Sequence, residues 1–72
     1  MTIRKSEVID RTDLRQYVTA IVNRMARRDC SLDAIMAEVD RCCADFPSSL
    51  TAYGMNPREY CDWACEDHGI TD

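Results

Sequence analysis

The sequence has 72 residues, of which 46% are hydrophobic and 31% charged, and its formal charge is −4. Such a length suits one small domain and leaves little volume for both a core and an enclosed catalytic pocket. No stretch approaches the ~18–20 apolar residues of a membrane span, and no apolar run follows the basic residues near the N-terminus. We therefore expect a soluble, cytoplasmic protein without a cleaved export signal.

The charges are divided unevenly along the chain. Residues 1–30 contain seven Lys or Arg and four Asp or Glu, whereas residues 31–72 contain two Arg and nine Asp or Glu, so a balance of +3 is followed by −7. An acidic C-terminal half repels nucleic-acid backbones, so nucleic acid is not the expected partner. The pattern favours a protein partner with a basic surface, and it also allows two copies to dock head to tail as a homodimer.

The N-terminal third predicts an arm followed by a helix. Residues 1–12 have no sustained helical period, and we expect an extended or frayed arm. From Thr12 onward, apolar residues recur with the i, i+3, i+4, i+7 spacing of an amphipathic helix. This pattern predicts a helix over about residues 13–28, with Thr12 or Asp13 as its N-cap.

A second amphipathic stretch follows after a very short connection. Ser31 is a suitable N-cap for it, and Pro47 stops it just after Phe46. So short a connection predicts an antiparallel hairpin whose apolar stripes face each other. The residues expected to form the hairpin core are Ile21, Val22, Ile35, Met36 and Val39.

The last predicted helix has the clearest local signals. Asn56 at the N-cap, Pro57 at the first helical position and Glu59 at the third resemble a capping box, and Gly69 supplies a left-handed stop. They predict a helix over residues 57–68. The preceding segment mixes turn formers with apolar residues, and a one-turn helix over residues 49–53 is compatible with it.

Together these elements predict one all-α domain over residues 1–72. Its expected architecture is an antiparallel helical hairpin with a third helix packed across it, which is a small three-helix domain.

The five cysteines are predicted to be reduced thiols that pack as small hydrophobic side chains. Cys61, Cys65 and His68 lie at i, i+4 and i+7 of the last helix, where a thiolate from Cys42 or Cys43 would complete a tetrahedral zinc site. However, the spacing is not that of a CxxC knuckle, and the helix needs the same stripe to pack on the hairpin. We expect no metal or other cofactor, and a structural zinc-binding module is the alternative.

No catalytic residues are predicted. The chain has one histidine, His68, and its neighbour Asp67 points about 100° away around the helix. A Cys–His nucleophile oriented by a third group therefore has no support in the sequence.

An arginine cluster, Arg24, Arg27 and Arg28, ends the first predicted helix, and Arg15 and Arg11 are candidates to join it. It suits a phosphate-binding patch, but cations also stabilise the negative end of a helix dipole without any ligand. The last helix carries carboxylates where a DNA-reading helix needs donors. A small DNA-associated regulator is therefore kept only as a further alternative.

The predicted interaction site lies on the last helix. Trp63 is placed at the margin of the apolar stripe, where a large aromatic surrounded by acids is typical of an interface anchor. Asp62 and Glu66 are its expected charged rim, and Glu59 and Tyr53 complete the site. These features favour a non-enzymatic protein-binding module. They also suit a small accessory or inhibitor protein of a phage or mobile element, for example an anti-defence protein such as an anti-CRISPR.

Overall fold

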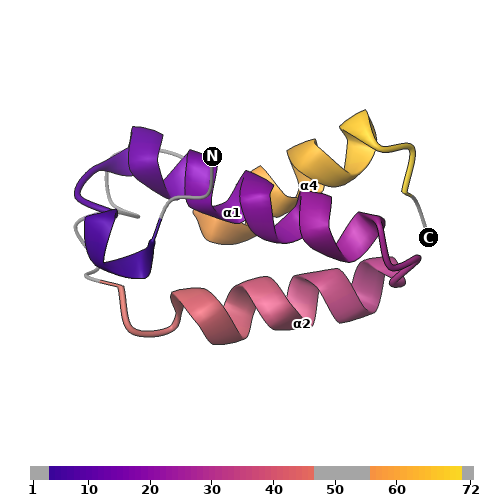
Figure 1. Ribbon diagram of the computed structural model, residues 1–72, viewed down its shortest axis with the longest axis horizontal. Coiled ribbons are helices and arrows are strands. Elements are labelled where there is room, and N and C mark those ends of the chain that lie inside the picture. The colour runs from indigo at the N-terminus through magenta and orange to yellow at the C-terminus, as the bar shows by residue number, and fades with distance from the viewer. Residues whose placement is uncertain (1–3, 47–55, 71–72) are drawn as a thin grey trace.

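The computed structural model describes residues 4–46 and 56–70 of the chain. The elements in these segments are a short 3-10 turn, η1 (Lys5–Glu7), and the helices α1 (Arg11–Ala26), α2 (Leu32–Cys43) and α4 (Pro57–Asp67). Helices α1 and α2 run antiparallel, and α4 packs against both and runs in the direction of α1 (Figure 1). This arrangement confirms the predicted all-α fold, and no strand occurs in the described segments.

The one-turn helix predicted over residues 49–53 lies outside the described residues. None of the described helices is long and apolar enough to cross a membrane.

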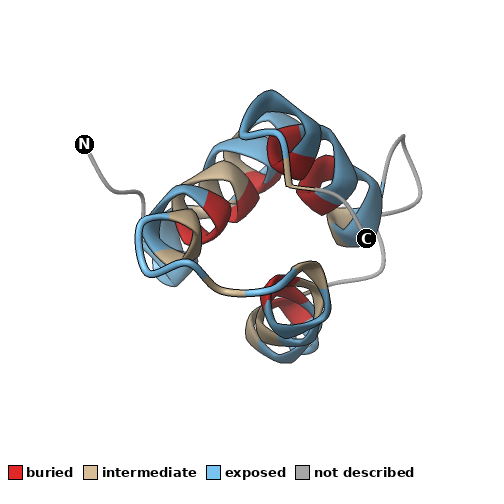
Figure 2. Ribbon diagram, turned by 90° about the vertical axis from the view of Figure 1, so that its right-hand side faces the viewer, coloured by how far each residue is buried: buried red, intermediate tan, exposed pale blue. Residues whose placement is uncertain are grey.

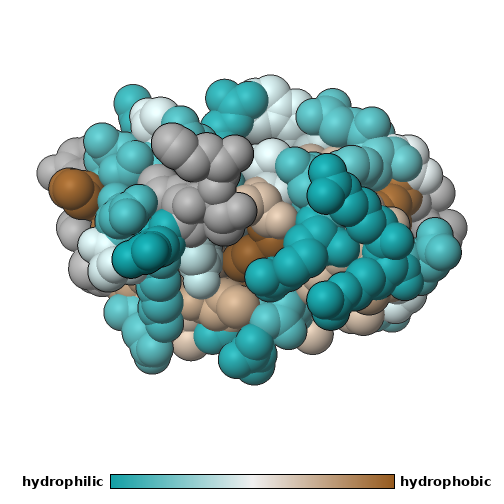
Figure 3. Space-filling view, in the orientation of Figure 1, coloured by the Kyte–Doolittle hydropathy of each residue, from teal (hydrophilic) through white to brown (hydrophobic). Residues whose placement is uncertain are grey.

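The core lies where the three helices face one another, as the inward stripes of buried residues in Figure 2 show. Outside this region, hydrophilic side chains dominate the face of the molecule drawn in Figure 3. Met36, which was expected in the hairpin core, is only partly buried because it is turned about 100° from Ile35 around α2. The buried residues are Leu14, Val18, Ile21 and Val22 of α1, Ile35, Val39 and Cys43 of α2, and Tyr60, Cys61, Ala64 and Cys65 of α4.

Helix α1 begins two residues earlier than predicted. Its N-cap is Asp10, whose Oδ1 accepts a hydrogen bond from the Asp13 N–H at 3.0 Å. The Asp13 carboxylate in turn accepts the Asp10 N–H at 3.4 Å, so the two aspartates form a capping box. The expectation that Thr12 or Asp13 caps the helix is therefore wrong, because Asp13 acts from the third helical position.

Residues 4–10, which precede α1, contain the 3-10 turn η1 where an extended or frayed arm over residues 1–12 was expected. Lys5 lies in η1, and its Nζ is 2.8 Å from the Asp45 carboxylate and 5.7 Å from the centre of the Phe46 ring. Val8 packs partly buried against the core. Lys5 therefore connects this part of the arm to Asp45 and Phe46, which follow α2.

Helix α2 ends at Cys43, before the predicted stop near Pro47. The chain turns after it, and the Phe46 N–H donates to the Cys43 carbonyl at 3.2 Å. This turn brings the Phe46 ring edge-on to Tyr17 of α1, with 5.4 Å between ring centres. An aromatic contact to another helix therefore takes the place of a further helical turn.

A left-handed residue closes the connection between α1 and α2. Asp29 has φ 57°, and its N–H donates to the Ala26 carbonyl at 3.2 Å. The Cys30 N–H donates to the Met25 carbonyl at 3.2 Å, which completes a Schellman motif. Ser31 then caps α2 as predicted, because its hydroxyl accepts the Ala34 N–H at 3.2 Å.

Helix α4 ends in the same way, as predicted from Gly69. This glycine has φ 71°, and its N–H donates to the Glu66 carbonyl at 3.0 Å. The Ile70 N–H reaches back to the Cys65 carbonyl at 2.9 Å. The two Schellman motifs thus differ in one respect, since one uses glycine and the other aspartate in the left-handed position.

We expect the Ile35→Ala substitution to lower the free energy of unfolding by about 2–5 kcal/mol, because it removes buried apolar surface and leaves a cavity. Urea unfolding followed by circular dichroism measures this loss. Asp40→Asn, on an exposed position of the same helix, is the control and should change the value by less than about 0.5 kcal/mol. An Ile35→Ala protein that unfolds like the unaltered one would contradict the central place of Ile35.

We expect Asp29→Gly to stabilise the protein and Gly69→Ala to destabilise it, each by about 1 kcal/mol, because a left-handed backbone costs a side-chain-bearing residue about that much. A Cβ at Gly69 would meet no atom within 4 Å, so the loss there comes from the backbone conformation alone. The same unfolding experiment measures both changes. Equal stability of all three proteins would show that neither turn is held in this conformation in solution.

Candidate functional site

A capping box fixes the residue at which α4 begins. The Asn56 side chain accepts the Glu59 N–H at 3.0 Å, and the Glu59 carboxylate accepts the Asn56 N–H at 3.0 Å. Pro57 occupies the first helical turn. The predicted capping box is confirmed, and the carboxylate of Glu59 is used to hold the helix start.

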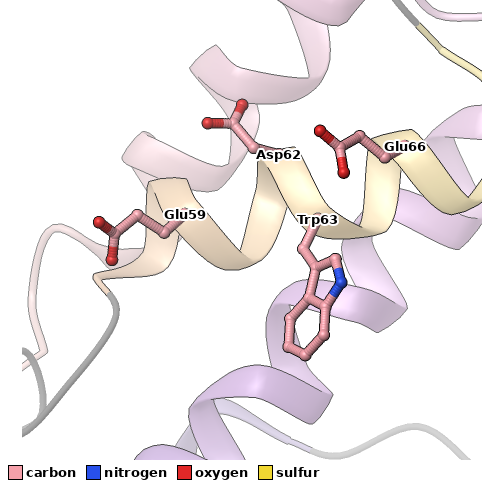
Figure 4. A pocket seen from close by; sticks show the side chains of 4 residues that line it. All are labelled: Glu59, Asp62, Trp63 and Glu66. Atoms are coloured by element: carbon pink, nitrogen blue, oxygen red, sulfur yellow. The ribbon is translucent and has the colours of Figure 1, made fainter.

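The outward face of α4 forms a shallow surface hollow. Tyr60, Cys61, Ala64 and Cys65 face the core, which turns a second set of residues to solvent. That set lines an open hollow of about 410 Å³ (Figure 4). We call this surface the α4 crest, and its residues are Glu59, Asp62, Trp63 and Glu66.

Trp63 supplies the aromatic part of the α4 crest. The residue is 43% exposed, and its indole extends toward α1 from one edge of this face, while the Asp62 and Glu66 carboxylates extend away from α1 (Figure 4). The guanidinium carbon of Arg15, on α1, lies 4.3 Å from the centre of the indole ring, a cation–π distance. Arg15 was not expected at the site, because nothing in the sequence shows which exposed residue of α1 faces α4.

The carboxylates of Asp62 and Glu66 form the acidic side of the α4 crest. Both residues are exposed, and neither has a hydrogen-bond or ion-pair partner within the described segments. They are four positions apart on one helix, where like charges repel each other. Neither carboxylate is therefore held in an ion pair with the described residues, and both are available to a cationic group.

The structure thus brings four of the five predicted interaction residues to one surface. They gather because the helical period places positions i, i+3, i+4 and i+7 on one face. The fifth, Tyr53, lies outside the described residues.

All five cysteines are free thiols, and three of them, Cys43, Cys61 and Cys65, are buried. Burial raises the pKa of the Cys61 thiol from 9.0 to about 12 and that of Cys43 from 9.0 to about 11. Burial also raises the pKa of Cys42, and a hydrogen bond from its Sγ to the Glu38 carboxylate at 3.1 Å adds to the effect. At neutral pH these groups are thiols rather than nucleophilic thiolates.

The stripe proposed for zinc does not form one site. Cys61 and Cys65 point into the core, whereas His68 is the exposed C-cap residue of α4. The His68 imidazole Nε2 donates instead to the Asn23 side-chain oxygen on α1, at 2.6 Å. In the part of the chain that the structure describes, no three His, Cys, Asp or Glu side chains are grouped so as to hold a metal ion.

The arginines considered for a phosphate patch lie at the end of α1. Arg24 is in the last turn, Arg27 is the C-cap residue and Arg28 follows it, and all three are exposed. This is the position at which cations complement the helix dipole.

Compared with known proteins, the chain matches no family model, no curated protein and no solved structure. The candidate site therefore rests on its own geometry and charge.

We expect the free energy of unfolding to fall as pH rises above about 9, because the unfolded chain loses thiol protons near pH 9.0 whereas folded Cys61 and Cys43 keep theirs to about 12 and 11. Urea unfolding from neutral pH to about pH 11, with a reductant and a chelator present, measures the slope. Cys61→Ala should make the slope shallower. An unchanged slope would mean that Cys61 is accessible to solvent. Circular dichroism at neutral pH before and after adding the chelator is a separate check, in which loss of helix would support the zinc site.

Proposed function

We propose that this protein is a non-enzymatic binding module that docks onto a basic surface of a partner protein through the α4 crest. The observation that carries the proposal is an exposed tryptophan beside carboxylates that have no ion-pair partner among the described residues: Trp63 next to Asp62 and Glu66. A partly exposed aromatic is a typical interface anchor, and it contributes most where charged neighbours form a rim around it.

The shape of the surface agrees with docking better than with enclosure of a small molecule. Small-molecule sites are concave and bury most of the ligand. The hollow of the α4 crest is lined by a single helix and is open. It therefore suits side chains presented by another macromolecule.

The charge of the protein supports a basic partner. The acidic excess of −7 lies in residues 31–72, which include α4. Such a field attracts a basic partner over a distance and increases the rate of association at low salt.

A binding role also agrees with the state of the reactive groups. The raised pKa values of Cys43 and Cys61 leave little thiolate at neutral pH. The imidazole of His68 contacts Asn23 and not a thiol. Neither group is arranged for nucleophilic catalysis.

We expect Asp62→Asn combined with Glu66→Gln to slow association with the partner mainly at low salt, and Trp63→Ala to speed dissociation. The partner is captured from the native host, identified by mass spectrometry, purified, and its binding kinetics measured on an immobilised sensor. Asp29→Asn combined with Asp33→Asn removes the same charge from exposed positions outside the α4 crest and is the matched control.

Two results would contradict the proposal. If Trp63→Ala unfolds the protein in a circular dichroism melt, the indole belongs to the core and is not an anchor. If the α4 variants fold and bind normally while Arg24→Glu with Arg28→Glu abolishes binding, the functional surface is the basic end of α1.

A further inference from the structure

We propose that the α4 crest recognises an arginine side chain of its partner, with the arginine stem on the Trp63 indole and the guanidinium between the Asp62 and Glu66 carboxylates. This inference rests on the proposed function and specifies the chemistry of the group that is bound. Its three elements are a hollow, an exposed aromatic surface and two carboxylates that form no ion pair in the part of the chain that the structure describes.

The layout of the α4 crest suits a long side chain with an apolar stem and a charged head. The indole extends from one edge of the exposed face of α4, toward α1, and the Asp62 and Glu66 carboxylates extend from the same face away from α1 (Figure 4). A side chain lying across the helix therefore meets an apolar surface first and negative charge at its end. Arginine and lysine both have this form, since they cover apolar surface with their stems while keeping the charge in water.

Two carboxylates one helical turn apart favour arginine over lysine. The guanidinium is planar and has five N–H donors in a fixed fork, so it can donate to Asp62 and Glu66 at the same time. An ammonium is a compact, strongly hydrated point charge, and it loses more hydration when it is held between two acids. Bridging also relieves the repulsion between the two carboxylates.

The protein already shows that its indole accepts a guanidinium. Arg15 lies 4.3 Å from the ring centre of Trp63, from the side of α1. Arg15 does not line the hollow, so the part of the indole that faces the hollow is left open. Arg15 thus holds the ring in position and leaves its outer surface to the incoming arginine.

The test uses two peptides of equal length and charge, both with blocked termini. One contains arginine residues separated by glycine, and the other has lysine in place of each arginine. Trp63 is the single tryptophan of the sequence, so its fluorescence reports binding directly, and calorimetry gives the affinity. We expect the arginine peptide to bind at least about tenfold more tightly than the lysine peptide and to change the fluorescence, because only the guanidinium makes the forked contact.

Matched variants locate the contact. Asp62→Asn and Glu66→Gln should each remove most of the preference for arginine, and the double variant should lose less than the product of the two single losses, because one guanidinium contacts both carboxylates. The double variant Asp29→Asn with Asp33→Asn has the same net charge as Asp62→Asn with Glu66→Gln. It should bind the arginine peptide like the unaltered protein. Circular dichroism melts show that each variant is folded.

The outcomes separate this inference from the proposed function. Equal affinity for both peptides, with loss of both in the Asp62 and Glu66 variants, would overturn arginine recognition and leave a basic partner in place. Binding of neither peptide, or binding that the α4 variants do not affect, would overturn both. If the double variant loses affinity for the arginine peptide by the full product of the two single losses, the two carboxylates act independently, and the bridging geometry would be overturned.

Discussion

The contact of α4 with the hairpin is the interaction on which the rest of the structure depends. Tyr60, Cys61, Ala64 and Cys65 fill the space that α1 and α2 leave between them, and without them the hairpin stripes would face water. Because a helix is rigid, burying this face also determines what faces outward. The rotation of α4 about its own axis therefore determines both which residues enter the core and which form the α4 crest. The Asn56–Glu59 capping box fixes where this helix starts.

The seam between α1 and α4 holds the exposed surface in place. Because the two helices run in the same direction (Figure 1), their side chains meet in pairs that follow the same order along both helices: Arg15 with Trp63, and further on Asn23 with His68. These contacts connect a basic helix to an acidic one, and within residues 4–46 and 56–70 no ion pair to the α4 carboxylates occurs. The negative charge of the surface is thus preserved although cations lie close by.

Local signals predicted the fold well where they act within one turn. Ser31, Asn56 and Gly69 mark helix ends by hydrogen bonds to their own neighbours, so their roles are readable from the sequence. The end of α2 was misplaced because Phe46 leaves the helix to contact Tyr17, which is a tertiary contact. Arg15 was missed for the same reason, since its role depends on how three helices pack, whereas the carboxylates beside Trp63 follow from helical periodicity alone.

Thiols inside the core also link the stability of this protein to its chemical lifetime. Oxidants and alkylating reagents reach Cys61 and Cys65 only when α4 detaches or the whole domain opens. A sulfinate or sulfonate formed at that moment is charged and does not fit back among Leu14 and Ile35. Under oxidising conditions each opening therefore risks irreversible oxidation of these two buried thiols. The rate of this damage depends on how often the domain opens.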